Sequence, residues 1–160
     1  KATPVASFII LVLLWFSGKN LSVIISMLMV FPVIYMNVLE GIRSADEKLL
    51  EMAQVFRLSV GKKLLYIYLP AVAPFFVSAC SVSLGLCWKS GIAAEVIGTP
   101  DGSIGAVFYQ AKIFLQTSEL LAWTVVVVAV SVAFEKLFMF LLRLVLKKLK
   151  MEDVLNGKRT

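Results

Sequence analysis

The chain has 160 residues, of which 60% are hydrophobic, and its mean hydropathy of +0.92 lies far above that of a soluble globular domain. It contains no histidine, which excludes histidine metal ligands and histidine acid–base catalysis. The net charge is +6, but its basic residues flank apolar segments and no aromatic residues are interleaved with them. We therefore expect anionic membrane lipid, and not nucleic acid, to be the partner of this charge.

Four apolar segments account for most of the chain. Residues 4–16 are short for a membrane span, because a helix that crosses a bilayer needs roughly 20 apolar residues. Residues 21–39, 71–97 and 120–142 are long enough, and we expect each of them to form a membrane helix. The chain begins at Lys1 without a methionine and enters an apolar run almost at once, so we expect one or more spans to precede it. The number of helices counted here is then a lower bound.

Positive charges mark two of the segments that connect or follow these spans. The insert 40–69 holds five Lys or Arg residues and the chain after residue 142 holds six, whereas the loop 98–119 holds one. The positive-inside rule therefore places the insert and the tail 143–160 in the cytoplasm. Within the tail we expect the basic residues up to 150 to continue a helix, and residues 151–160 to be disordered.

The cytoplasmic insert has the pattern of two short helices. Residues 44–47 read Ser-Ala-Asp-Glu, which predicts a capping box with Ser44 as the N-cap. An apolar stripe follows at helical spacing, formed by Leu49, Met52, Ala53 and Phe56. Ser59 is a second candidate cap, residues 60–69 read as a second helix, and Pro70 is expected to open the next segment. An amphipathic hairpin lying on the membrane surface is the alternative interpretation of this pattern.

The spacing of Glu51-x-Ala53 and Ile67-x-Leu69-Pro70 resembles the EAA loop of the permease subunits of bacterial ABC importers. The resemblance implies an all-α, polytopic membrane helix bundle of the type I importer kind, forming one permease domain over residues 1–160, with residues 41–69 as a coupling loop. In that family the loop docks on a separate ATPase subunit. The residues expected at this contact are Glu51, Ala53, Phe56, Arg57, Ile67, Leu69 and Pro70.

Two residues of the insert depart from the family pattern. Met52 replaces the second alanine, and Arg57 stands where the family usually has glycine at the turn between the two helices. Glycine accepts a positive φ without strain, whereas arginine pays roughly 1 kcal/mol or more for it. Either residues 59–61 make the turn instead, or Arg57 adopts the strained conformation.

Further motifs resemble the branch that imports nitrate, sulfonates, taurine and thiamine precursors. They read Phe31-Pro32-Val33-Ile34-Tyr35-Met36-Asn37, Glu40-Gly41-Ile42-Arg43, Leu69-Pro70-Ala71-x-x-Pro74, Trp88, Ala93-Ala94-Glu95-x-Ile97-Gly98, Gly102-x-x-Gly105 and Leu115-Gln116-Thr117. The resemblance implies a multi-pass protein of the bacterial inner membrane, which binds no cofactor and is not an enzyme. It also implies three protein partners: an ATPase subunit, an external solute-binding protein, and a second permease subunit, which we expect to be a second copy. The solute expected from this branch is a small anion such as nitrate, a sulfonate or taurine.

The third long span contains two charged residues, Lys89 and Glu95. A charge at bilayer depth usually faces the bundle interior or water, so Lys89, Trp88 and Glu95 are candidates for the translocation path. Lys89 could instead pair with a charge on another helix or on a second subunit, and a structural hydrogen bond is the favoured role of Glu95. Cys80 and Cys87 lie about 10 Å apart along one helix face, too far for a disulfide, and are expected to be small packing residues.

The loop after this span is rich in glycine but has no Gly-Lys-Ser/Thr ending, so it is not a nucleotide-binding loop. A short helix is expected over residues 106–115, where the external solute-binding protein could make contact. Two alternatives to the importer for small anions stay open from sequence. The chain could be a membrane scaffold or regulatory protein that docks a cytoplasmic partner through residues 44–69, or a permease for a solute that resembles a thiamine precursor.

Overall fold

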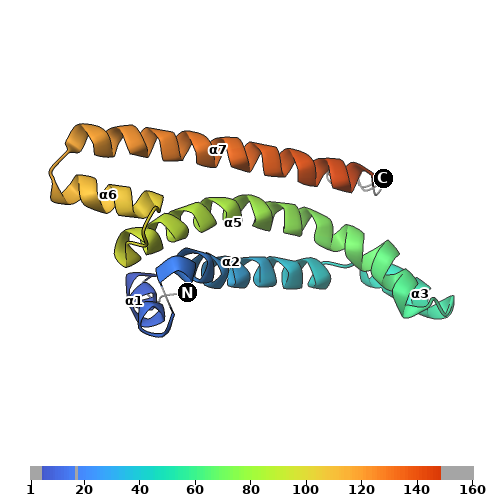
Figure 1. The fold of residues 1–160 in the computed structure, drawn as a ribbon. Helices are drawn as coiled ribbons and strands as arrows, with labels where there is room; N and C mark the ends of the chain where they lie inside the picture. Colours follow the sequence, from blue (N-terminus) through green and yellow to red (C-terminus); the bar gives the residue numbers. More distant parts are fainter. Residues whose placement is uncertain (1–4, 17, 149–160) are drawn as a thin grey trace. The chain divides into compact units, whose positions relative to one another are not determined.

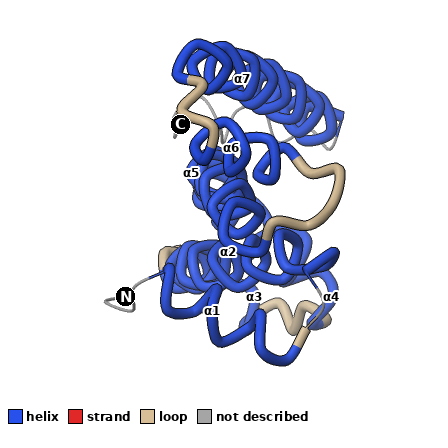
Figure 2. The backbone as a smooth tube through the Cα atoms, turned by 60° about the vertical axis from the view of Figure 1, so that its left-hand side comes forward, coloured by secondary structure: helices blue, strands red, loops and turns tan. Residues whose placement is uncertain are grey.

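The computed structural model describes residues 5–16 and 18–148, and all regular structure in these ranges is helical (Figures 1 and 2). The elements in chain order are α1 (Val5–Trp15), α2 (Gly18–Arg43), α3 (Glu47–Val55), α4 (Val60–Lys63), the π-helical turn η1 (Leu64–Tyr68), α5 (Leu69–Gly98), α6 (Ile104–Ile113) and α7 (Thr117–Lys148). The predicted all-α fold class is confirmed. The predicted disorder of residues 151–160 lies outside the described residues.

Three helical segments of the described chain are long and apolar enough to cross a membrane. They are Asn20–Arg43, Val60–Gly98 and Thr117–Lys147, and each contains one of the three predicted spans. The remaining apolar segment, at the start of the chain, forms α1, which at 11 residues is short for a span, as its sequence predicts.

The described chain divides into two compact units, and both are built from parts of the same long helices. Of the described residues, the first unit takes those up to Phe31 and Ser83–Lys136, and the second takes Pro32–Val82 and those from Leu137 onward. The candidate pocket described below lies in the first unit, and the insert between the first two long helices, residues 44–68, lies in the second.

In the first unit, α1 packs against the start of α2 and the end of α5. The buried residues of this core are Ile9, Leu21, Ile25 and Ala94. Small residues let the backbones approach: a Cβ added at Gly98 would lie 2.5 Å from Leu21 Cδ2, which leaves no room for a larger residue unless the leucine moves. Close contact through small residues is the usual way in which membrane helices associate.

The second unit uses the same principle where α2 meets α5. A Cβ added at Gly41 would lie 2.8 Å from the Cα of Val72, so the two backbones cross with no space for a side chain between them. Ala73 of α5 and Leu146 of α7 are the buried pair of a second small core, with Val77 and Leu142 packed against them.

The predicted capping box at the start of the insert is wrong. Asp46 is the N-cap of α3, and its side chain accepts a hydrogen bond from the Lys48 amide at 2.9 Å. The Ser44 hydroxyl donates instead to the Gly41 carbonyl oxygen at 2.9 Å, and the Ser44 amide donates to Glu40. Ser44 therefore completes the last turn of α2, and the helix that follows can begin only two residues later.

The predicted boundary at Pro70 is also wrong, because helix runs without a break from α4 through η1 into α5. Proline lacks an amide proton, and its ring clashes with the carbonyl four residues earlier in a regular α-helix. The π-helical turn lies directly before Pro70, and the Leu69 amide donates to Leu64, five residues back. This wider turn accommodates the proline inside a continuous helix. Ser59 is the N-cap of α4 by backbone conformation, although its side chain makes no capping hydrogen bond.

Helix α6 begins and ends two residues earlier than predicted, at Ile104 and Ile113. Its N-cap is Ser103, whose hydroxyl accepts a hydrogen bond from the Ala106 amide at 3.1 Å. The final helix α7 continues through the basic residues after 142 up to Lys148, which confirms the predicted helix as far as the described residues extend.

Candidate functional site

The first candidate site is the apolar face of α3 in the insert between α2 and α5. Ala53 is fully buried, whereas Leu49, Met52 and Phe56 of the same stripe are 43%, 50% and 70% exposed. The carboxylate-bearing Glu51 is also exposed. The small residue of the stripe thus packs inward, and the large residues form an uncovered apolar face.

Arg57 makes the turn that ends this helix. Its φ is +49°, and its amide donates to Gln54 while the Leu58 amide donates to Ala53, both at 3.0 Å. This pair of hydrogen bonds is the Schellman motif, which usually has glycine at the position of Arg57. Of the two alternatives left open by the sequence, the strained arginine is therefore the one observed, at a cost of about 1 kcal/mol.

The remaining residues of the predicted ATPase contact lie at the junction with α5. Ile67 is buried in the π-helical turn, Leu69 is exposed, and Pro70 is half-buried. The predicted set therefore divides into an exposed group on and after α3 and a group that holds the insert to the membrane helix.

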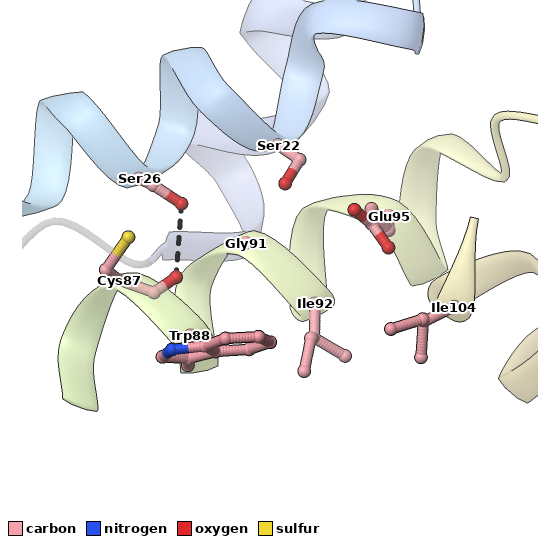
Figure 3. A pocket seen from close by; sticks show the side chains of 8 residues that line it. All are labelled: Ser22, Ser26, Cys87, Trp88, Gly91, Ile92, Glu95 and Ile104. Atoms are coloured by element: carbon pink, nitrogen blue, oxygen red, sulfur yellow. Dashed lines mark hydrogen bonds between the residues drawn. The ribbon is translucent and has the colours of Figure 1, made fainter. Parts of the chain in front are cut away.

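The second candidate site is a pocket in the first unit, lined by residues of α2, α5 and α6 (Figure 3). Its volume is about 220 Å³, and its lining residues are Ser22, Ser26, Cys87, Trp88, Gly91, Ile92, Glu95 and Ile104. The Ser26 hydroxyl donates a hydrogen bond to the Cys87 carbonyl oxygen at 3.1 Å and ties α2 to α5. A Cβ added at Gly91 would lie 2.9 Å from Ser26 Oγ and 3.2 Å from Ser22 Oγ, so glycine keeps this space open.

Glu95 joins α5 to the start of α6. Its Oε2 accepts a hydrogen bond from the Gly105 amide at 3.1 Å, at the positive end of the α6 dipole. A Cβ added at Gly105 would lie 2.3 Å from Glu95 Cβ, so the two helices meet where only glycine fits. The hydrogen bond expected for Glu95 is therefore present, and it links two of the motifs noted in the sequence.

The three candidate path residues are not brought together. Trp88 and Glu95 line the pocket, whereas Lys89 is exposed and is not among the lining residues. The Trp88 ring also packs edge-on against Phe134 of α7, with centroids 6.1 Å apart. Ser22, Ser26 and Gly91 were missed by the sequence analysis, although two serines four residues apart in a membrane helix are a usable signal for a polar face.

Cysteine and metal chemistry are not indicated in the described part of the chain. Cys80 and Cys87 are both free thiols, as their spacing predicts. Among the described residues no group of three or more Cys, Asp and Glu side chains could hold a metal ion.

Comparison with known proteins decides the family. Residues 1–151 match the family described as "Binding-protein-dependent transport system inner membrane component". The chain belongs to this family. Together with its three long apolar helices, this makes it a multi-pass membrane protein, and it confirms the resemblance to importer permeases.

Relatives within the family carry names that refer to sulfonates and taurine. The chain is 37% identical over 134 residues to the putative aliphatic sulfonates transport permease protein SsuC of Escherichia coli (strain K12), covering 81% of this chain and 47% of that protein. It is 32% identical over 123 residues to the SsuC protein of Bacillus subtilis (strain 168), covering 76% and 44%. It is 26% identical over 136 residues to the taurine transport system permease protein TauC of Escherichia coli (strain K12), covering 84% and 49%. The chain thus spans about half the length of these relatives, and no solved structure matches it.

Proposed function

We propose that this chain belongs to the membrane-spanning permease subunit of an ATP-driven importer and forms part of the solute path. A separate cytoplasmic ATPase subunit would bind the insert, an external binding protein would deliver the solute, and a second copy of the permease would complete the path. The observation that carries this proposal is the uncovered apolar face of α3 in an insert between two membrane helices.

The chemistry of this face suits a protein partner. Large apolar side chains on a charged connecting segment are unfavourable in water unless a partner covers them. Val55 and Phe56, which are 79% and 70% exposed, stand at the end of α3 beside the Arg57 turn. Glu51 adds an acidic group that can pair with a basic residue of the partner and fix the orientation of docking.

The geometry of the insert supports the transmission of motion. Because α4, η1 and α5 form one continuous helix, displacement of the insert acts directly on the membrane span. In the proposed cycle, closure of the ATPase subunits moves α3 and thereby tilts α5, which alternates access to the solute path.

The proposed solute is small and carries an anionic group, with a sulfonate, taurine or nitrate as the favoured examples. Support comes from the relatives named for aliphatic sulfonates and taurine, and from a nitrate import permease protein, NrtB, of Synechococcus elongatus, which is 26% identical over 145 residues. Lys89 is exposed on a membrane helix, and an uncompensated charge there is favourable only against water, an anion or an acidic partner. We place Lys89 on the water-filled path.

Affinity purification of the full-length protein from membranes tests the ATPase contact. Recovery of an ATPase subunit is expected with the wild type and should be lost with Glu51→Arg, because the charge at the docking surface is reversed. Glu119→Arg is the matched control: it makes the same change of charge at an exposed position in the first turn of α7, outside the insert. Equal recovery with both variants would place the ATPase contact elsewhere, and no ATPase with the wild type would contradict the importer.

A further inference from the structure

The pocket between α2, α5 and α6 contains a carboxylate and no basic side chain (Figure 3). Glu95 is the charged member of its lining. Its Oε2 accepts the Gly105 amide, and no ion pair to Glu95 is present in the part of the chain that the structure describes. Helix α6 offsets part of this charge, but its dipole amounts to only about half an elementary charge. The pocket therefore attracts cations and repels anions.

Several oxygen atoms in the pocket have lone pairs that accept no hydrogen bond from the described residues. Within the described residues, Glu95 Oε1 and the Ser22 hydroxyl make no hydrogen bond. The Ser26 hydroxyl uses its proton on Cys87 and keeps its oxygen lone pairs. A group with several donors and a positive charge satisfies such a set best, and an ammonium group has three donors.

The rest of the lining suits the carbon chain beside such a group. Trp88 and Ile92 provide apolar surface, and an indole ring also attracts a nearby cation. The volume of about 220 Å³ exceeds the roughly 30 Å³ that one water occupies, yet lies below the roughly 300–1,000 Å³ of sites for drug-sized ligands. The space accordingly fits a solute of a few heavy atoms.

We propose that this pocket binds the ammonium group of a small zwitterionic solute, of the aminoalkyl sulfonate class. The ammonium preference rests on Glu95, Ser22 and Ser26. The sulfonate part rests on the proposed function, through the relatives named for sulfonates and taurine. Solutes that carry only negative charge, such as ethanesulfonate, are not held here.

Cys87 lines the pocket and serves as a reporter of what enters it. In the full-length protein with Cys80→Ala, and with any cysteine outside this chain replaced, Cys87 is treated with aminoethyl or sulfonatoethyl methanethiosulfonate. In each reaction the Cys87 thiolate attacks the sulfenyl sulfur, a mixed disulfide forms and methanesulfinate leaves. Rates are divided by those of the same reagents with 2-mercaptoethanol. The cationic reagent is expected to be favoured about tenfold, and taurine, but not ethanesulfonate, is expected to protect the thiol.

Variants separate the charge of Glu95 from its structural hydrogen bond. Glu95→Gln keeps an acceptor for the Gly105 amide but removes the charge, so both the tenfold preference and the protection by taurine should be lost. Glu119→Gln, outside the pocket, should keep both. Ser22→Ala leaves the Glu95–Gly105 hydrogen bond in place and should weaken the protection severalfold, which provides a second test if Glu95→Gln fails to fold.

Any of four results would overturn the proposal: an unchanged preference in Glu95→Gln, equal protection by ethanesulfonate, no protection by taurine, or no reaction of Cys87 with either reagent. Because labelling does not depend on transport, the outcome is independent of the importer assignment. Uptake of sulfonates without protection by taurine would refute the pocket and leave the importer intact. Protection by taurine in a protein that recovers no ATPase subunit would refute the importer and leave the pocket intact.

Discussion

Replacing Gly105 with alanine is expected to destabilise the protein by about 2–4 kcal/mol. The added Cβ would lie 2.3 Å from Glu95 Cβ, 2.4 Å from the Glu95 carbonyl carbon and 2.5 Å from the Val96 amide nitrogen. None of these atoms is the flexible end of a side chain, so α6 must move away from α5. Overpacking of this kind costs roughly 1–3 kcal/mol. Loss of the 3.1 Å hydrogen bond from Gly105 to Glu95 adds about 1 kcal/mol.

The measurement is the free energy of unfolding of the full-length protein in detergent micelles, followed by denaturant titration. Gly85→Ala is the matched control, because the same methyl group added in α5 meets no atom within 4 Å. That variant should be unchanged or more stable by up to about 1 kcal/mol, since alanine favours helix over glycine. If Gly105→Ala were as stable as Gly85→Ala, the close approach of α5 and α6 would be refuted.

Three further changes in the second unit test its local geometry by the same titration. Arg57→Gly should raise stability by about 1 kcal/mol because glycine accepts the φ of +49° without strain, and a loss of stability would contradict the observed turn. Gly41→Ala should destabilise by roughly 1–3 kcal/mol, since the added Cβ would lie 2.8 Å from the backbone of α5; a neutral result would argue against this crossing. Asp46→Ala should lose about 1 kcal/mol of N-cap stabilisation and exceed the loss in Ser44→Ala, and the opposite order would restore the predicted capping box.

The membrane helices could be predicted because hydropathy is a sum over about 20 neighbouring residues and needs no tertiary information. The start of α3 could not be predicted from sequence, because Ser44 and Asp46 are both residues that commonly cap helix N-termini. What decides between them is where α2 ends, and the Ser44 amide is already used by the last turn of that helix. A positive φ at Arg57 was one of two alternatives that the sequence offered, since the family pattern has glycine at this position. Only the backbone of the structure shows that Arg57, and not residues 59–61, adopts it.

The pocket could not be predicted from the sequence, because its residues come from helices that are far apart along the chain. Ser22 and Ser26 belong to α2, and the residues that face them across the pocket lie about 65 positions later on α5. Nothing in either segment alone specifies that they pair, because the apolar residues of both would pack against many partners. Glu95 and Gly105 are separated by only ten residues, yet the turn between them had to be known before their contact could be inferred.

The continuity of helix across Pro70 changes how the proposed coupling would work. A helix that ended before the proline would leave a flexible joint, and motion of the insert would be partly lost there. In the structure the π-helical turn Leu64–Tyr68 joins α4 directly to α5, and Ile67 within it is buried. A π-helical turn of this kind can kink a helix without interrupting it. The insert is thus attached to the membrane span through continuous helix, so displacement at α3 would reach α5 as a change of tilt.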